Sequence, residues 1–182
     1  MVAAIAYAQT IALLPISLFG ISIATSELSE MSRVLGEKEA RNQVLRQRIE
    51  SAYSKISYFV IPSSIAFILV GGCLITLILQ TGRFTSNDTL VVWMVLAAYG
   101  VGSLASTYSR LSSSTFWALH DTRTPLKCSL CRVAVNVSLG LLVVSKRDSI
   151  PAAYSGAALA LMSSIGGWLE FWVLQHLLKK EI

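Results

Sequence analysis

Charged side chains are scarce in this chain, because Asp, Glu, Lys and Arg together make up 14% of its 182 residues. A soluble domain of this size carries about 25% charged residues. Hydrophobic residues make up 54% of the chain, which is more than one buried core requires. The composition therefore excludes an ordinary soluble domain and indicates that much of the surface faces lipid.

The residue types that bind metals or act as nucleophiles are also few, with three cysteines and two histidines. Cys128 and Cys131 form one C-x-x-C pair, without the second ligand pair of a zinc site or the context of a redox motif, and we interpret both as helix packing residues. His120 and His176 are far apart along the chain, so we expect no metal site. The sequence contains no nucleophile–base pair, phosphate-binding glycine loop or carboxylate dyad, and we expect neither an enzyme nor a cofactor.

Long apolar runs occupy most of the chain instead. They cover residues 2–24, 56–79, 90–111, 126–144 and 152–178. A hydrocarbon core about 30 Å thick is crossed by ~20 helical residues, which rise ~1.5 Å each. Lipid offers no partner to a backbone N–H or C=O, so only helices or closed barrels span it. The sequence therefore predicts an all-α, polytopic membrane helix bundle of about five transmembrane helices, forming a single unit over residues 1–182.

The connection between the first two runs is polar. Residues 26–33 are predicted to form a turn, and residues 37–54 have the pattern of an amphipathic helix with Val44, Leu45 and Ile49 on one side. Arginines lie largely on another side of this segment. We interpret residues 37–54 as a separate cytoplasmic helix that lies on the membrane surface.

Lysine and arginine are distributed unevenly between the two sides of the predicted bundle. Twelve of the 15 lie on the side that holds the first and third connections and the C-terminal tail. The positive-inside rule places that side in the cytoplasm, with the N-terminus outside. We interpret the net charge of +5 as contact with lipid headgroups and expect no nucleic acid partner. An odd number of spans that starts outside leads us to expect a preceding hairpin or lobe of the same protein.

Small hydroxyl side chains are concentrated at the end of the third run. They are Ser103, Ser106, Thr107, Ser109, Ser112, Ser113, Ser114 and Thr115. Small residues let helices approach closely, and hydroxyls form hydrogen bonds between helices. The pattern predicts that this end of the third span faces protein or water and not lipid.

Several polar residues interrupt the apolar runs, where a central charge costs roughly 2.5–3.5 kcal/mol on insertion scales. Arg110, near the inner end of the third run, either lines a cavity or reaches the headgroups. Glu170 lies deeper, and we expect it to pair with a Lys or Arg on a neighbouring helix. Gln9 and Thr10 interrupt the first run, and Asn136 interrupts the fourth, where its amide can bond across a helix interface.

Four groups of residues follow one another at a distinctive spacing. They comprise Tyr7 to Gly20 with Met31-Ser-Arg33; Gly82-Arg-Phe-Thr85 with Ala97 to Gly102; Phe116-Trp-Ala-Leu-His-Asp-Thr-Arg-Thr-Pro125; and Gly156-Ala-Ala158 with Trp168. In this order they resemble the MurJ/MviN family of lipid II flippases over nearly the whole chain. The family-motif positions are Arg83, Phe84, Asp121, Arg123 and Pro125.

The resemblance implies a fourteen-helix fold in two lobes, in which this chain corresponds to helices eight to twelve. It implies a protein of the bacterial inner membrane that moves an undecaprenyl-pyrophosphate-linked peptidoglycan precursor outward by alternating access. A central cationic cavity would take the pyrophosphate, membrane lipids would surround the helices, and an N-terminal lobe of the same protein would be the partner of this chain.

One position departs from the family pattern. Members commonly carry Asp-Arg where this chain has Gln9 and Thr10, and a neutral pair cannot bind an anion through charge-assisted hydrogen bonds as Arg does. Arg110 matches a basic position that is common in the family. The candidate substrate-binding residues are therefore Arg110, Asn136, Gln9 and Thr10. The alternatives are an exporter of another lipid-linked oligosaccharide or a drug, and a truncated, non-transporting membrane module.

Overall fold

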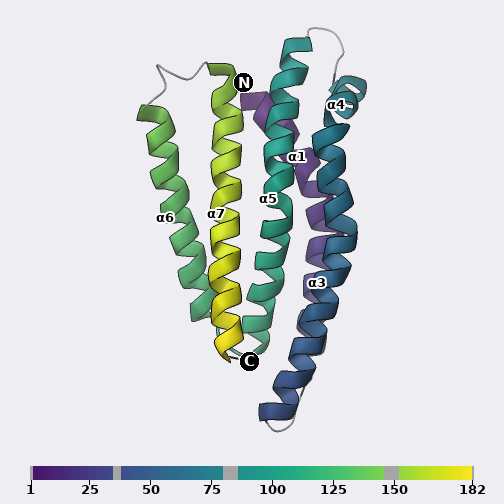
Figure 1. Cartoon of the computed structure of the whole chain (residues 1–182), viewed down its shortest axis with the longest axis vertical. Coiled ribbons are helices and arrows are strands. Elements are labelled where there is room, and N and C mark those ends of the chain that lie inside the picture. The colour runs from purple at the N-terminus through teal and green to yellow at the C-terminus, as the bar shows by residue number, and fades with distance from the viewer. Residues whose placement is uncertain (1, 35–37, 80–85, 146–151, 182) are drawn as a thin grey trace.

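The computed structural model describes residues 2–34, 38–79, 86–145 and 152–181, and every element within them is a helix. Figure 1 shows these helices side by side in a bundle, with the N-terminus at one end and the C-terminus at the other. The all-α prediction is confirmed. The elements are α1 (Val2–Pro15), η1 (Ile16–Ile21), α2 (Ser22–Met31), α3 (Lys38–Leu69), α4 (Gly71–Leu79), α5 (Ser86–Ala118), α6 (Arg123–Ser145) and α7 (Ala152–Glu181).

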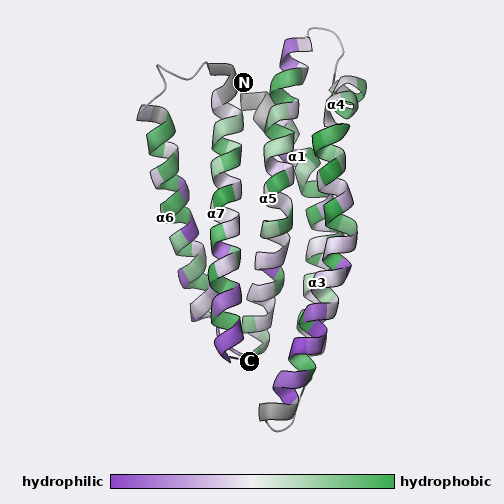
Figure 2. Cartoon of the chain, in the orientation of Figure 1, coloured by the Kyte–Doolittle hydropathy of each residue, from purple (hydrophilic) through white to green (hydrophobic). Residues whose placement is uncertain are grey.

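Among the described residues, five helical stretches are long and apolar enough to cross a membrane. They are Ala6–Met31, Arg41–Leu69, Ser86–Ala118, Arg123–Val143 and Ser155–Glu181. Figure 2 shows apolar residues along most of the bundle, while hydrophilic residues gather at the lower ends of α3 and α7. The prediction of about five spans is confirmed.

Helix α5 is the centre of the bundle. It packs against α7, α3, α1, α2 and α4, and it is the most buried of the five spans. Helix α6 is the least buried and packs mainly against α7. Val92, Val95 and Leu96 of α5 are fully buried in the upper core. Because lipid is as apolar as these side chains, close packing and interhelical hydrogen bonds stabilise such a bundle more than the hydrophobic effect does.

Polar contacts join the helices at several levels. The Tyr53 hydroxyl of α3 lies 2.7 Å from the Ser112 hydroxyl of α5 and donates to Gln175 Oε1 of α7 at 2.9 Å. Higher up, the Ser64 and Ser103 hydroxyls lie 2.8 Å apart. Interhelical bonds of this kind contribute about 0.6–2 kcal/mol each. Helix α5 is therefore held on both sides by the hydroxyls that its sequence supplies.

The first span is irregular at its middle. Pro15 has no N–H to donate and its ring disturbs the preceding turn, and the next six residues form the π-helix η1. Gly20 within η1 packs closely on the Thr107 side chain of α5. This irregular segment belongs to one wall of the cavity described below.

Helix α2 continues to Met31, so the prediction of a polar turn at residues 26–33 is wrong for most of that segment. The Thr25 and Ser26 hydroxyls donate to carbonyls of their own helix, which satisfies them without ending it. Glu27 is buried and accepts a hydrogen bond from Lys55 of α3 at 3.3 Å. Contacts with α3 therefore keep this polar stretch helical.

The separate surface helix predicted for residues 37–54 is also wrong over the part that the structure describes. Helix α3 runs without a break from Lys38 to Leu69, because no Gly or Pro precedes Pro62, and Pro62 itself lies inside the helix. Leu45 and Ile49 are buried in a core cluster that includes residues of α2, α5 and α7. The apolar side of this segment therefore faces the bundle.

Candidate functional site

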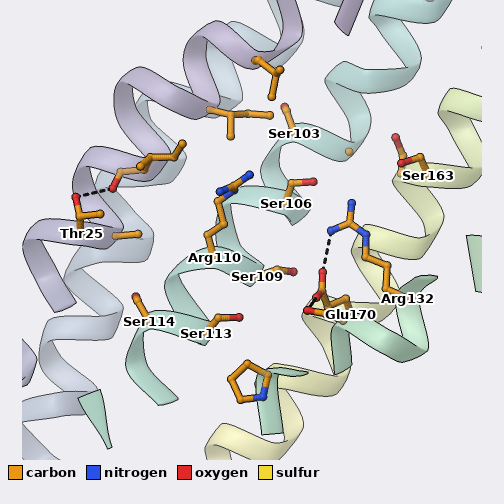
Figure 3. A pocket seen from close by; sticks show the side chains of 18 of the residues that line it. Thr25, Ser103, Ser106, Ser109, Arg110, Ser113, Ser114, Arg132, Ser163 and Glu170 are labelled. Carbon is orange, nitrogen blue, oxygen red and sulfur yellow. Dashed lines mark hydrogen bonds and ion pairs between the residues drawn. The ribbon is translucent and has the colours of Figure 1, made fainter. Parts of the chain in front are cut away.

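A cavity of about 780 Å³ lies between α1–α2, α5, α6 and α7. Most of its apolar lining comes from the first span, and most of its hydroxyls come from α5. The charged side chains that line it are Arg110, Arg132 and Glu170. Figure 3 shows Arg110 between Thr25 on one side and the Arg132–Glu170 pair on the other.

The hydroxyls of α5 fall into two groups. Those of Ser103, Thr107, Ser112, Ser114 and Thr115 donate to carbonyls three or four residues earlier, so they are satisfied within the helix. Ser106, Ser109 and Ser113 line the cavity and make no hydrogen bond with the residues that the structure describes. The prediction that this end of the third span faces protein or water is confirmed, and the spacing of the second group gives the cavity a polar stripe.

Arg110 lies on that stripe. It lines the cavity and is exposed, and its guanidinium makes no ion pair or hydrogen bond within the described part of the chain. Of the two interpretations offered by the sequence, the structure favours the cavity. An unpaired guanidinium offers five N–H donors in a planar fork that matches carboxylate and phosphate oxygens.

Glu170 of α7 is buried and pairs with Arg132 of α6, with Arg132 Nη1 2.8 Å from Glu170 Oε2. The Ser129 hydroxyl donates to the other carboxylate oxygen at 2.8 Å. The expected pairing of Glu170 with a cation on a neighbouring helix is therefore confirmed. From the sequence alone, Arg132 is one of the twelve basic residues that indicate the orientation, and nothing assigns it to a cavity. The sequence feature that indicates its position is the spacing of Ser129 and Arg132, which lie one turn apart and therefore on one face of α6.

The other three candidate residues are dispersed. Gln9 lines the cavity, whereas Thr10 lies outside its lining and its hydroxyl donates to the Ala6 carbonyl at 2.9 Å. Asn136 also lies outside the lining and packs so closely on Gly166 of α7 that a methyl group there would overlap its amide oxygen. That oxygen is buried and has no hydrogen-bond partner among the residues that the structure describes. The structure thus places Gln9 and Arg110 in the lining of one cavity and leaves Thr10 and Asn136 outside it.

The motif residues of the α5–α6 connection form a tight cap. Asp121 Oδ1 accepts the backbone N–H of Arg123 at 2.9 Å and of Thr124 at 3.2 Å, as an N-terminal helix cap does. A hydrogen bond from the Thr124 side chain is the main reason why the pKa of Asp121 lies below its ordinary value. His120 before it has a φ of 62°, which ends α5 in the left-handed region. Pro125 is buried and lines the cavity.

The exposed Arg123 begins α6, while Arg83 and Phe84 lie outside the described residues. Within the described ranges, no group of three or more His, Cys, Asp or Glu side chains is arranged to hold a metal ion.

The sequence model of the family described as Lipid II flippase MurJ matches residues 1–182. The chain belongs to the lipid II flippase MurJ family. Probable lipid II flippase MurJ of Rickettsia prowazekii is 28% identical over 178 residues, which are 97% of this chain and 34% of that protein. The lipid II flippase MurJ of Thermosipho africanus is 30% identical over 162 residues, which are 88% of this chain and 31% of that protein.

A solved structure of lipid II flippase MurJ, in an inward closed conformation, has the same fold as this chain. The two superpose with a TM-score of 0.84 at 26% identity, over 97% of this chain and 35% of the MurJ structure. The chain therefore spans about a third of the length of the MurJ proteins that it matches. The resemblance read from the four motifs is confirmed, and it makes the chain part of a family of membrane transporters.

Proposed function

We propose that this chain is part of a lipid II flippase and forms one side of the cavity that receives the anionic headgroup of the lipid-linked peptidoglycan precursor. The observation that carries the proposal is that Arg110 faces a cavity of about 780 Å³ and that neither it nor the neighbouring hydroxyls of Ser106, Ser109 and Ser113 have a partner among the described residues. A diphosphate binds guanidinium groups through charge-assisted hydrogen bonds and accepts further bonds from hydroxyls. Membership of the MurJ family supports this substrate class.

The chain corresponds in this proposal to helices eight to twelve of the fourteen-helix family fold, and an N-terminal lobe of the same protein completes the cavity. The chain covers about a third of the length of its relatives, which supports this placement. The protein lies in the bacterial inner membrane with the C-terminus of this chain in the cytoplasm. The positive-inside rule supports this orientation, since twelve of 15 basic residues lie on that side.

Complementation tests the proposal directly. The full-length gene is expressed in a bacterium depleted of its own lipid II flippase, with immunoblotting to confirm membrane expression. We expect growth and normal cell shape to be restored. Well-expressed protein that fails to restore growth, and that fails to move labelled lipid II across proteoliposome membranes, would rule the proposal out.

An exporter of another lipid-linked oligosaccharide is the second candidate function. It is favoured by Gln9, a neutral side chain in the cavity lining at a position where the family resemblance implies a charged pair. Depletion of the protein in its native host separates the two functions. Accumulation of lipid II supports the flippase, whereas unchanged lipid II together with loss of a surface polysaccharide supports the exporter.

A further inference from the structure

The Arg132–Glu170 pair joins two helices at the cavity wall with unequal exposure of its partners. The Glu170 side chain is 6% exposed and the Arg132 side chain 27% exposed, with 2.8 Å between Nη1 and Oε2. The carboxylate is therefore withdrawn between α6 and α7, while part of the guanidinium remains open to the cavity that both residues line. A ligand in the cavity meets the positive partner first.

Both carboxylate oxygens of Glu170 are engaged. One accepts from Arg132 and the other from the Ser129 hydroxyl at 2.8 Å, and Ser129 and Arg132 lie one turn apart on α6. The carboxylate is thus held from two directions, and its Oε2 holds one nitrogen of the guanidinium. A pair that served only to join α6 to α7 would gain little over apolar packing, because burying two charges costs about as much as their attraction returns.

The guanidinium of Arg132 has donors to spare. Arginine carries five N–H donors in a rigid fork, and the contact with Glu170 is the hydrogen bond that Arg132 makes among the described residues. Gly167 of α7 lies beside the guanidinium, with no side chain to cover it. The unused donors are therefore available to an anion in the cavity.

Arg110 is the second cation of the same cavity, on α5 and not on α6 (Figure 3). We propose that Arg132 is a further anion-binding residue, positioned by Glu170, and that Arg132 and Arg110 together bind the two phosphate groups of a diphosphate. This inference rests on the proposed function, which requires only that the cavity receives an anionic headgroup. Phosphoryl oxygens are the shared chemistry, whether they belong to a lipid headgroup or to free pyrophosphate.

The test uses the full-length protein in nanodiscs and four neutral variants of similar shape. They are Arg132→Gln, Glu170→Gln, the double variant Arg132→Gln/Glu170→Gln, and Arg110→Gln. Arg46→Gln is the matched control, because Arg46 is an exposed arginine of α3 outside the cavity lining. The probes are inorganic phosphate, inorganic pyrophosphate and undecaprenyl diphosphate, with binding measured by calorimetry and folding checked by thermal unfolding.

We expect Arg132→Gln to weaken undecaprenyl diphosphate binding roughly tenfold or more, as the loss of a charge-assisted contact does. Glu170→Gln keeps a side-chain oxygen that can still accept from Arg132, so the guanidinium stays in position while a negative charge is removed. We therefore expect binding within about threefold of the parent, or tighter. The double variant restores a neutral hydrogen-bonded pair, and we expect it to unfold at the parent's temperature but to bind as weakly as Arg132→Gln. If a single variant misfolds, the double variant still shows whether binding requires the charge of Arg132.

Equal losses for Arg132→Gln and Glu170→Gln, or parent-like binding by Arg132→Gln, would overturn the inference. If Arg110→Gln loses binding while Arg132→Gln keeps it, the inference fails and the proposed function stands. If neither arginine variant nor the control differs from the parent, both the inference and the proposed function fail. If Arg132→Gln weakens the binding of both inorganic pyrophosphate and undecaprenyl diphosphate, the site recognises the diphosphate alone. If it weakens the binding of undecaprenyl diphosphate only, the site recognises the lipid-linked form. Inorganic phosphate binding as tightly as pyrophosphate contradicts the two-cation arrangement.

Discussion

Gly102 of α5 lies directly against Ser164 of α7, so that a methyl group at Gly102 would overlap the Ser164 hydroxyl and lie 2.8 Å from its Cβ. The Ser164 hydroxyl donates to the Ala98 carbonyl of α5 at 2.8 Å. The absence of a side chain at Gly102 therefore lets the two most extensively packed helices of the bundle share a hydrogen bond near the cavity.

Enlarging this contact is expected to destabilise the bundle. Gly102→Ala forces α5 and α7 apart, and overpacking of this kind costs about 1–3 kcal/mol. Thermal unfolding of the purified protein in detergent measures the effect as a lowered Tm. Gly140→Ala in α6 is the matched control, since a methyl group there meets only Leu159 Cδ2 at 4.0 Å. A Tm for Gly102→Ala at or above that of Gly140→Ala would contradict the close approach.

The charge of Arg110 is expected to matter for transport. Arg110→Ala removes the unpaired cation of the cavity, and we expect transport of labelled lipid II in proteoliposomes to fall roughly tenfold, the loss of one charge-assisted contact. Arg110→Lys keeps the charge and should retain most of the activity. Arg46→Ala should transport at the parent rate. Equal rates for Arg110→Ala and the parent would reduce Arg110 to a side chain that reaches the headgroups.

The Asp121 cap is expected to stabilise α6 in a pH-dependent way. Its pKa lies below the ordinary value of 3.8, chiefly through the Thr124 side-chain hydrogen bond, so the ionised form contributes stability above that value. This contribution begins to fall when the pH drops below 3.8. It is lost once the pH has also dropped below the lowered pKa that Asp121 has in the folded protein. Asp121→Ala should cost about 0.5–2 kcal/mol at neutral pH.

Asp121→Asn is the control for this cap, because an amide oxygen accepts the same backbone N–H groups without a charge. Tm values of the parent and both variants, measured from neutral to acidic pH, separate the two effects. The difference between the parent and Asp121→Asn should shrink as the pH falls, while the difference between Asp121→Asn and Asp121→Ala should persist. A parent advantage over Asp121→Asn that grows toward acidic pH would refute the prediction.

The Tyr53 hydroxyl is expected to hold three helices together. Tyr53→Phe removes its contacts with Ser112 at 2.7 Å and Gln175 at 2.9 Å. We expect a loss of about 0.6–2 kcal/mol for such interhelical bonds, seen as a lower Tm in detergent. Tyr58→Phe, at a tyrosine that is 75% exposed on the same helix, should leave the Tm unchanged. Equal Tm values for the two variants would show that the Tyr53 bonds contribute nothing.

Local pattern was sufficient for the number and type of the spans but not for their ends. The first run was expected to end at residue 24, yet α2 continues to Met31 because Glu27 finds a partner in Lys55. The second run is interrupted at Val70, where the Trp93 indole of α5 donates to the Ile68 carbonyl at 3.2 Å. Both boundaries depend on residues that are distant in the sequence, which periodicity within a segment does not report.

The site was predictable only in part for the same reason. A hydroxyl-rich end of α5 and a partner for Glu170 follow from the cost of polar groups in lipid. Which cation pairs with Glu170 depends on how α6 packs on α7. Ser129 and Arg132 share one face of α6, but only the packing of the two helices shows that this face lies opposite Glu170. Gln9 and Thr10 stand together at the position of the family's Asp-Arg pair, but neighbouring helical residues point about 100° apart, and only Gln9 lines the cavity.

Length and hydropathy by themselves determined that this protein is a helical membrane bundle, because lipid satisfies no backbone hydrogen bond and a span needs a minimum number of residues. The order of its motifs determined its family. Only the tertiary structure decided which polar side chains meet. Arg110, Arg132 and Glu170 belong to three different helices, and their common cavity arises from the close approach of α5 to α7 and the packing of α6 against α7.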